Sequence, residues 1–203
     1  MTPHVPYPPL FVFAMIGPIV YWAIVLILVL ASVCSIAFTL RRPRRVFVYV
    51  AAGTLAAAVA MAAFPSPQAP TIVGALLGIA CLVLAVAGGG PAVQLVLALA
   101  SRGSVAGEHG GIVVPGSDSA SSPGAPHEVL RGGTTIGLLE RLATAGAIMA
   151  GFPSAIAVLV AIKGVGRFSE LDAAEARERF IIGTLVSLIW ACACAAVFHL
   201  AIR

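Results

Sequence analysis

Charged side chains are scarce in this sequence and almost missing from its first half. Only 10% of the 203 residues are Asp, Glu, Lys or Arg, whereas about a quarter are charged in a typical soluble domain. The first 101 residues carry four charges, Arg41, Arg42, Arg44 and Arg45. So few charges cannot keep a water-facing surface soluble. This scarcity excludes a soluble globular domain and predicts an all-α integral membrane protein.

Catalytic and metal-binding signatures are also missing. The sequence contains no GxSxG, HExxH or CxxCH motif, and its four cysteines, Cys34, Cys81, Cys192 and Cys194, all fall inside apolar runs. Cys192 and Cys194 are separated by one residue and point to different faces of a helix, so a zinc site is not indicated. We predict buried thiols, no catalytic residue, no metal ligand and no cofactor, which disfavours an enzyme.

The first hundred residues predict three membrane helices. Residues 1–10 are rich in proline, are not expected to form a helix, and lack the basic region of a secretory signal. The best spanning window follows at 19–39, with Tyr21 and Trp22 as interfacial aromatic residues. Residues 46–64 return across the bilayer, 65–70 form a proline-rich turn, and 71–87 cross again. Gly88–Pro91 then interrupts the run, so 92–100 is either a kinked continuation or a short interfacial helix.

The composition changes between residues 101 and 133. This stretch is rich in Gly, Ser and Pro and poor in aromatic residues, so it cannot bury enough apolar surface to offset the entropy lost on ordering. The sequence therefore predicts three parts: an N-terminal membrane region at 1–100, a flexible linker at 101–133 and a C-terminal membrane module at 134–203.

The stretch 134–168 predicts a helical hairpin. A single helix of this length would run to about 50 Å, well beyond the hydrocarbon core of about 30 Å. A turn at Gly151 and Phe152 would place Glu140 and Lys163 about eleven residues from the apex on antiparallel helices. We therefore predict an intramembrane ion pair between these two side chains.

Together with a last helix through 180–200, the hairpin predicts a six-helix polytopic bundle; five helices is the alternative if 134–168 forms one broken span. The positive-inside rule places the arginine cluster and the linker in the cytoplasm and both termini outside. If 134–168 crossed only once, Lys163, Arg167, Arg177 and Arg179 would lie outside, which favours the hairpin.

Two further groups of residues are candidates for contacts. Small residues spaced four apart, Gly74 with Gly78 and Gly183 with Ser187, are candidates for close helix packing, the first pair between the second and third helices. Arginines beside the apolar segments are candidates for anionic-lipid contact or ion pairing on the cytoplasmic side: Arg41, Arg42, Arg44, Arg45, Arg141 and Arg167.

The C-terminal third resembles the membrane region of an uncharacterised bacterial integral membrane protein family. The matching positions are 139–141 (Leu-Glu-Arg), Lys163, Arg167 with Phe168, and 182–187 (Ile-Gly-Thr-Leu-Val-Ser). The likeness covers 134–196, and residues 1–133 show none. It implies that 134–196 is one module in a bacterial membrane. Polar residues in another part of that family have no counterpart in the first half of this chain, so no reaction is implied.

These observations predict a non-enzymatic accessory or scaffold subunit of a membrane protein assembly, located in the bacterial plasma membrane. Its expected partners are the lipid bilayer, including anionic lipids, and another membrane protein or a second copy of itself, but not nucleic acid. The alternative is a small transporter or channel that uses a polar intramembrane site near Glu140 and Lys163.

Overall fold

The fold is built from α-helices. The computed structural model describes residues 8–100, 133–168 and 174–203, with side chains at 16–100, 133–165 and 177–203. Within these residues there are six helices and no strand: α1 (Pro8–Arg41), α2 (Arg45–Ala62), α3 (Thr71–Ala100), α4 (Gly133–Met149), α5 (Ala155–Phe168) and α6 (Ala174–Ala201). The predicted all-α, six-helix architecture is confirmed. The predicted linker falls almost entirely outside the described residues.

Four of the six helices are long and apolar enough to cross a membrane. These are α1, α2, α3 and α6. At about 1.5 Å per residue, the 17 residues of α4 and the 14 residues of α5 reach only about 26 and 21 Å, less than the hydrocarbon thickness of about 30 Å. The hairpin therefore consists of two helices that are each short for a complete span.

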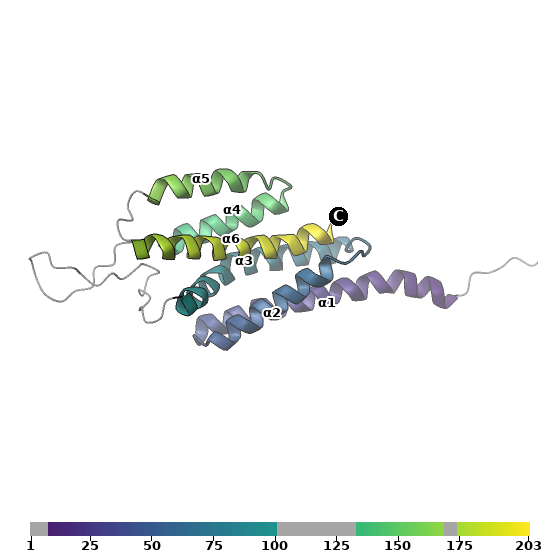
Figure 1. Cartoon of the computed structure of the whole chain (residues 1–203). Helices are drawn as coiled ribbons and strands as arrows, with labels where there is room; N and C mark the ends of the chain where they lie inside the picture. The colour runs from purple at the N-terminus through teal and green to yellow at the C-terminus, as the bar shows by residue number, and fades with distance from the viewer. Residues whose placement is uncertain (1–7, 101–132, 169–173) are drawn as a thin grey trace, which may run out of the picture.

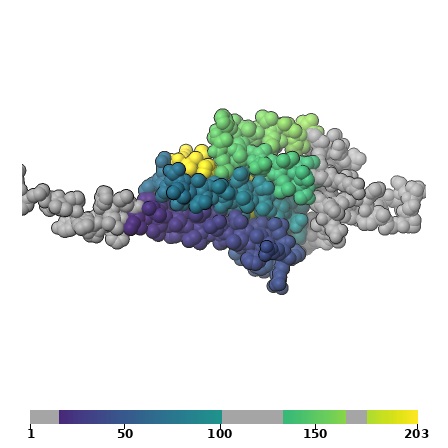
Figure 2. Space-filling model, turned by 180° about the vertical axis from the view of Figure 1, so that it is seen from behind, coloured from purple at the N-terminus to yellow at the C-terminus, as the bar shows by residue number. Residues whose placement is uncertain are grey.

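The helices pack around a central pair, α3 and α6. Figure 1 shows α3 and α6 side by side, with α1 and α2 on one flank and α4 and α5 on the other. Seen from behind, α1 and α2 form one edge of the molecule and the α4–α5 hairpin forms the opposite edge (Figure 2). The most extensive contacts join α3 to α6, so the C-terminal module packs directly on the N-terminal region.

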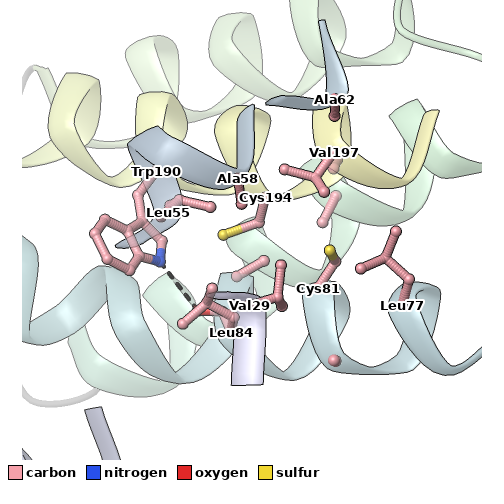
Figure 3. Packing of buried hydrophobic residues seen from close by; sticks show 14 of the residues in the cluster. Val29, Leu55, Ala58, Ala62, Leu77, Cys81, Leu84, Trp190, Cys194 and Val197 are labelled. Carbon is pink, nitrogen blue, oxygen red and sulfur yellow. Dashed lines mark hydrogen bonds between the residues drawn. The ribbon is translucent and has the colours of Figure 1, made fainter. Parts of the chain in front are cut away.

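The core lies where α1, α2, α3 and α6 meet. Figure 3 shows Leu55 and Ala58 of α2 facing Cys194 and Val197 of α6, above side chains of α3. Cys81 and Cys194 are fully buried in this cluster, as predicted, and Cys192 is half-buried. The prediction of a buried thiol was wrong for Cys34, which is exposed on α1. Elsewhere the helices expose large apolar side chains, such as Ile27 and Ile189, which suits a surface that faces lipid.

Two aromatic side chains of α1 bind backbone carbonyls at the end of α2 and in the turn between α2 and α3. Trp22 is 1% exposed, and its Nε1 donates a hydrogen bond of 2.7 Å to the carbonyl of Pro67. The Tyr21 hydroxyl donates to the carbonyl of Met61. The position of Tyr21 and Trp22 at the membrane interface stays a prediction, and the indole N–H of Trp22 has a backbone acceptor within the protein.

Two proline-containing stretches are helical, and only the first of them was not expected to be. Helix α1 begins at Pro8, inside the stretch not expected to be helical, because proline is compatible with the first turn of a helix. Helix α3 continues through Gly88–Pro91 to Ala100, so 92–100 is a continuation and not a separate helix. Gly90, having no Cβ, avoids much of the clash that a residue before proline otherwise meets in a helix.

Candidate functional site

A tight turn at Gly151 makes the hairpin possible. Gly151 has φ = 83°, a left-handed conformation that costs glycine little. Its N–H donates to Ile148 at 3.0 Å, and the N–H of Phe152 donates to Ala147 at 2.8 Å. This pair of bonds is the Schellman pattern that ends a helix. The chain reverses where the sequence predicted it, so the five-helix alternative, in which 134–168 forms one broken span, is excluded.

The reversal brings the charged side chains of the hairpin together. The Lys163 ammonium group donates to the Glu140 carboxylate in an ion pair that joins α5 to α4. The two side chains are only 18% and 12% exposed. Lys163 also lies 5.5 Å from the ring centroid of Phe180 on α6, within cation–π range. The predicted Glu140–Lys163 pair is present, and Phe180 is a third partner that the sequence did not indicate.

Arg141 projects from α4 in a different direction, into the space between α3 and α6. Its side chain is 6% exposed. Nε donates to the carbonyl of Val86 at 3.0 Å, and Nη1 donates to the Ser187 hydroxyl at 3.2 Å. Arg141 was predicted as a lipid-contact or pairing residue of the cytoplasmic side; most of its side chain lies inside the bundle, where two neutral acceptors offset part of its desolvation.

Glycines of α3 create the room for this arrangement. A Cβ atom at Gly89 would lie 2.2 Å from Cδ of Arg141, and one at Gly88 would lie 2.6 Å from the indole of Trp190. Trp190 donates from Nε1 to the carbonyl of Leu84 at 3.0 Å, as Figure 3 shows. Two side chains of the C-terminal module therefore bind backbone carbonyls of α3 across two glycines that have no side chain to block them.

Pro91 lies on α3 close to the carbonyl of Val86 that Arg141 binds. It lacks an N–H, so the carbonyl four residues earlier loses its helical donor, and the ring disturbs the ladder around it. The Val86 carbonyl bound by Arg141 lies one residue before that position. We call the segment 84–91 of α3, with its carbonyls, glycines and proline, the glycine–proline segment. Arg141 and Trp190 both bind backbone carbonyls of this segment.

The small-residue pairs pack closely, though not all where predicted. A Cβ at Gly78 would lie 2.8 Å from the Phe198 ring, and one at Gly74 would lie 3.9 Å from Ile202. Phe198 belongs to α6 and Ile202 directly follows that helix, so the expected approach of α2 to α3 at these glycines was wrong. A Cβ at Gly183 would lie 3.3 Å from Cγ1 of Val93 on α3. Ser187 accepts the hydrogen bond from Arg141.

The remaining predicted arginines lie apart from this junction. Arg41, Arg42, Arg44 and Arg45 are exposed around the connection between α1 and α2, flanked by the stacked rings of Phe38 and Phe47 at 5.9 Å. The side chain of Arg167 lies outside the described part of the structure.

The arrangement is suited to holding helices together. Within the described residues, the charged groups of the hairpin contact a partner of opposite charge, an aromatic ring or neutral acceptors, and no group of three His, Cys, Asp or Glu side chains could hold a metal ion. Sequence reasoning missed Trp190 and the docking role of Gly88 and Gly89. The triple glycine beside a proline was the available signal, since such segments expose backbone groups to a neighbour.

Comparisons with protein-family models, with curated proteins and with solved structures find no match. The resemblance of 134–196 to an uncharacterised bacterial membrane family therefore stays a prediction.

Proposed function

We propose that this chain is a non-enzymatic, multi-pass membrane protein that serves as an accessory or scaffold subunit of a membrane protein assembly. The observation that supports the proposal is that the charged side chains of the hairpin contact partners on neighbouring helices. Lys163 pairs with Glu140, and Arg141 binds Val86 and Ser187. Charged groups inside a membrane segment either pair or serve a transported ligand, and here each has protein partners that join two helices.

The outer face of α5 supports contact with another membrane component. Helix α5 packs on α4, and its far side exposes Val158, Ile162 and Val165 at 61%, 69% and 81%. A short apolar helix adapts to a thicker bilayer by thinning it or by associating with another protein. We propose association, with a second copy of this chain or with another membrane protein.

The distribution of basic side chains supports an orientation. The α1–α2 connection, the end of α5 and the start of α6 lie at one end of the bundle (Figure 1), and they carry Arg41–Arg45, Lys163, Arg177 and Arg179. Basic residues favour the cytoplasmic side. We propose a bacterial plasma membrane location with this end in the cytoplasm and both termini outside.

Co-purification in mild detergent tests the scaffold proposal. The tagged chain is extracted from its native membrane, and the masses and ratios of the recovered chains are determined. A complex of fixed stoichiometry, with itself or with another membrane protein, is the expected result. A monodisperse single chain of 20.6 kDa would contradict the proposal.

A small transporter or channel is the second candidate, because the Glu140–Lys163 pair is 12–18% exposed and so is partly reachable from outside the helices. This function predicts that Glu140→Gln and Lys163→Met change ion flux in liposomes while the variants stay folded. The scaffold proposal predicts no flux in the parent protein and a loss of stability in the same variants.

A further inference from the structure

The charges around the hairpin do not balance. Glu140 is paired with Lys163, while both hydrogen bonds of Arg141 go to neutral oxygens, the Val86 carbonyl and the Ser187 hydroxyl. These three charged side chains therefore carry one net positive charge in a half-buried place. A charge removed from water is costly unless an opposite charge or a full set of hydrogen bonds compensates it.

The hydrogen bonds of Arg141 are also incomplete. A guanidinium group has five N–H donors, and Arg141 uses one on Nε and one on Nη1. Among the described residues, the other three donors, all on the two Nη atoms, have no acceptor. We call these free donors, one on Nη1 and two on Nη2, the terminal edge of the guanidinium; N–H groups of a guanidinium can bind two oxygens of a phosphate in a bidentate manner.

Gly137 leaves this edge uncovered on α4. A Cβ atom at Gly137 would lie 3.2 Å from Nη1 and 3.8 Å from Nη2 of Arg141. Any side chain at that position would therefore cover the edge. Gly137 is itself half-buried, and residues 134–136 on the preceding turn are exposed. The guanidinium therefore lies next to a residue without a side chain, about one turn from an exposed part of α4.

The depth of this edge suits a lipid headgroup. Gly137 lies four residues after Gly133, the first residue of α4, which is about 6 Å along the helix. That end of α4 lies with the start of α6 and the end of α5, where the basic side chains gather (Figure 1). The terminal edge of Arg141 is thus within one or two turns of the membrane surface that we propose to be cytoplasmic.

We propose that Arg141, reached past Gly137, binds the phosphate of one anionic phospholipid of the inner leaflet. The inference rests on the membrane location and orientation proposed above, and it does not depend on the scaffold role. The lipid phosphate supplies the missing negative charge and the acceptors for the free Nη donors, while the acyl chains lie along the apolar surface of α4. The site is distinct from the exposed arginines at 41–45.

The test is a lipid titration of the purified full-length chain in a neutral detergent. Phosphatidylglycerol, phosphatidylcholine and inorganic phosphate are added separately, and the thermal midpoint and the lipid retained in native mass spectrometry are measured. We expect phosphatidylglycerol to raise the midpoint and one molecule to be retained, with much weaker effects of the other two. An equal effect of inorganic phosphate would overturn the proposal, because the ligand would then be a free anion.

Two glycines on α4 provide matched variants. Gly137→Leu covers the guanidinium edge, whereas nothing lies within 4 Å of a Cβ at Gly146, so Gly146→Leu adds the same side chain away from Arg141. We expect Gly137→Leu to need about tenfold more phosphatidylglycerol for the same stabilisation, as loss of a charge-assisted bidentate contact implies. Gly146→Leu is expected to behave like the parent. Equal titrations for Gly137→Leu and the parent would overturn the proposal.

A second variant covers the case in which Gly137→Leu does not fold. Arg141→Lys keeps the charge and loses the planar fork, so it is expected to bind phosphatidylglycerol more weakly than the parent; an unchanged titration would overturn the proposal. Loss of the response on neutralising Arg41, Arg42, Arg44 and Arg45 would overturn it too, by assigning the lipid to that cluster. Stabilisation by a co-purifying protein but not by phosphatidylglycerol would assign Arg141 to a partner's carboxylate.

Discussion

At the scale of single residues, Arg141 shows how a charge can remain in an apolar helix bundle. Taking a guanidinium out of water costs several kcal/mol, and a hydrogen bond from a charged donor returns about 1.5–3 kcal/mol. The bonds to Val86 and Ser187 thus offset much of that cost. Both acceptors belong to other helices, so the guanidinium has these hydrogen bonds only when α3, α4 and α6 are packed together.

At the two glycines of the glycine–proline segment, adding a single methyl group is predicted to lower the stability of the protein. Gly88→Ala would place a Cβ 2.6 Å from the rigid indole of Trp190, and Gly89→Ala would place one 2.2 Å from Cδ of Arg141. Overpacking of this kind costs about 1–3 kcal/mol. We expect a lower thermal midpoint for both variants in detergent, measured by size-exclusion chromatography after heating.

Helical glycines with open surroundings are the controls for that experiment. A Cβ at Gly53 or Gly146 would meet nothing within 4 Å, so Gly53→Ala and Gly146→Ala are expected to be neutral or to stabilise by about 0.5–1 kcal/mol through helix propensity. If the Gly88→Ala variant were as stable as the Gly53→Ala variant, Trp190 would not pack on the glycine–proline segment.

At the scale of secondary-structure elements, the hairpin joins its two short helices to the bundle through one polar cluster. Lys163 on α5 contacts Glu140 on α4 and lies against Phe180 on α6. Since α4 is the helix on which α5 mainly packs among the described residues, this cluster is a principal link between α5 and the last helix.

Exchanging the two charges tests that link. Glu140→Lys or Lys163→Glu alone places like charges together on half-buried positions, and we expect a loss of about 1–3 kcal/mol. The double exchange is expected to recover most of it, though not the part due to the Phe180 ring. The exposed Glu178 provides a control, since Glu178→Lys is expected to change stability by less than about 0.5 kcal/mol. Additive losses in the double exchange would mean that the pair does not form.

Sequence reasoning was most successful where the signal was local. The scarcity of charge predicted membrane helices, and the Gly151–Phe152 break with charges at equal distance predicted both the turn and the ion pair. It was least successful where a side chain found an acceptor on another helix. Nothing near Trp22, Trp190 or Arg141 in the sequence identifies Pro67, Leu84 or Val86 as its acceptor, because these contacts depend on how whole helices pack.

At the scale of the molecule, the two membrane parts are held together by packing and not only by the chain between them. The helices of 133–203 dock on α3 through Arg141, Trp190 and the close approaches at Gly78 and Gly183. We therefore expect residues 1–116 and 117–203, expressed as separate chains in one cell, to assemble in the membrane.

Co-purification measures this assembly. A tag on the first fragment is expected to recover the second at a ratio close to one to one, and Gly88→Ala in the first fragment is expected to reduce that recovery. Fragments that never co-purify, although both reach the membrane, would show that the two parts have no stable contact of their own.

The central claim is that α6 packs directly on α3, and disulfide trapping between the two fragments tests this contact most directly. A Cβ at Gly183 would lie 3.3 Å from Cγ1 of Val93, the atom bonded to its Cβ, so the two Cβ atoms are near enough to reach the separation of about 3.5–4.5 Å that a disulfide needs. With the native cysteines replaced, Val93→Cys and Gly183→Cys are expected to join the two fragments into one band under mild oxidation, whereas Gly53→Cys with Gly183→Cys is expected to leave them separate. No cross-link between 93 and 183, or equal cross-linking of both pairs, would contradict the account.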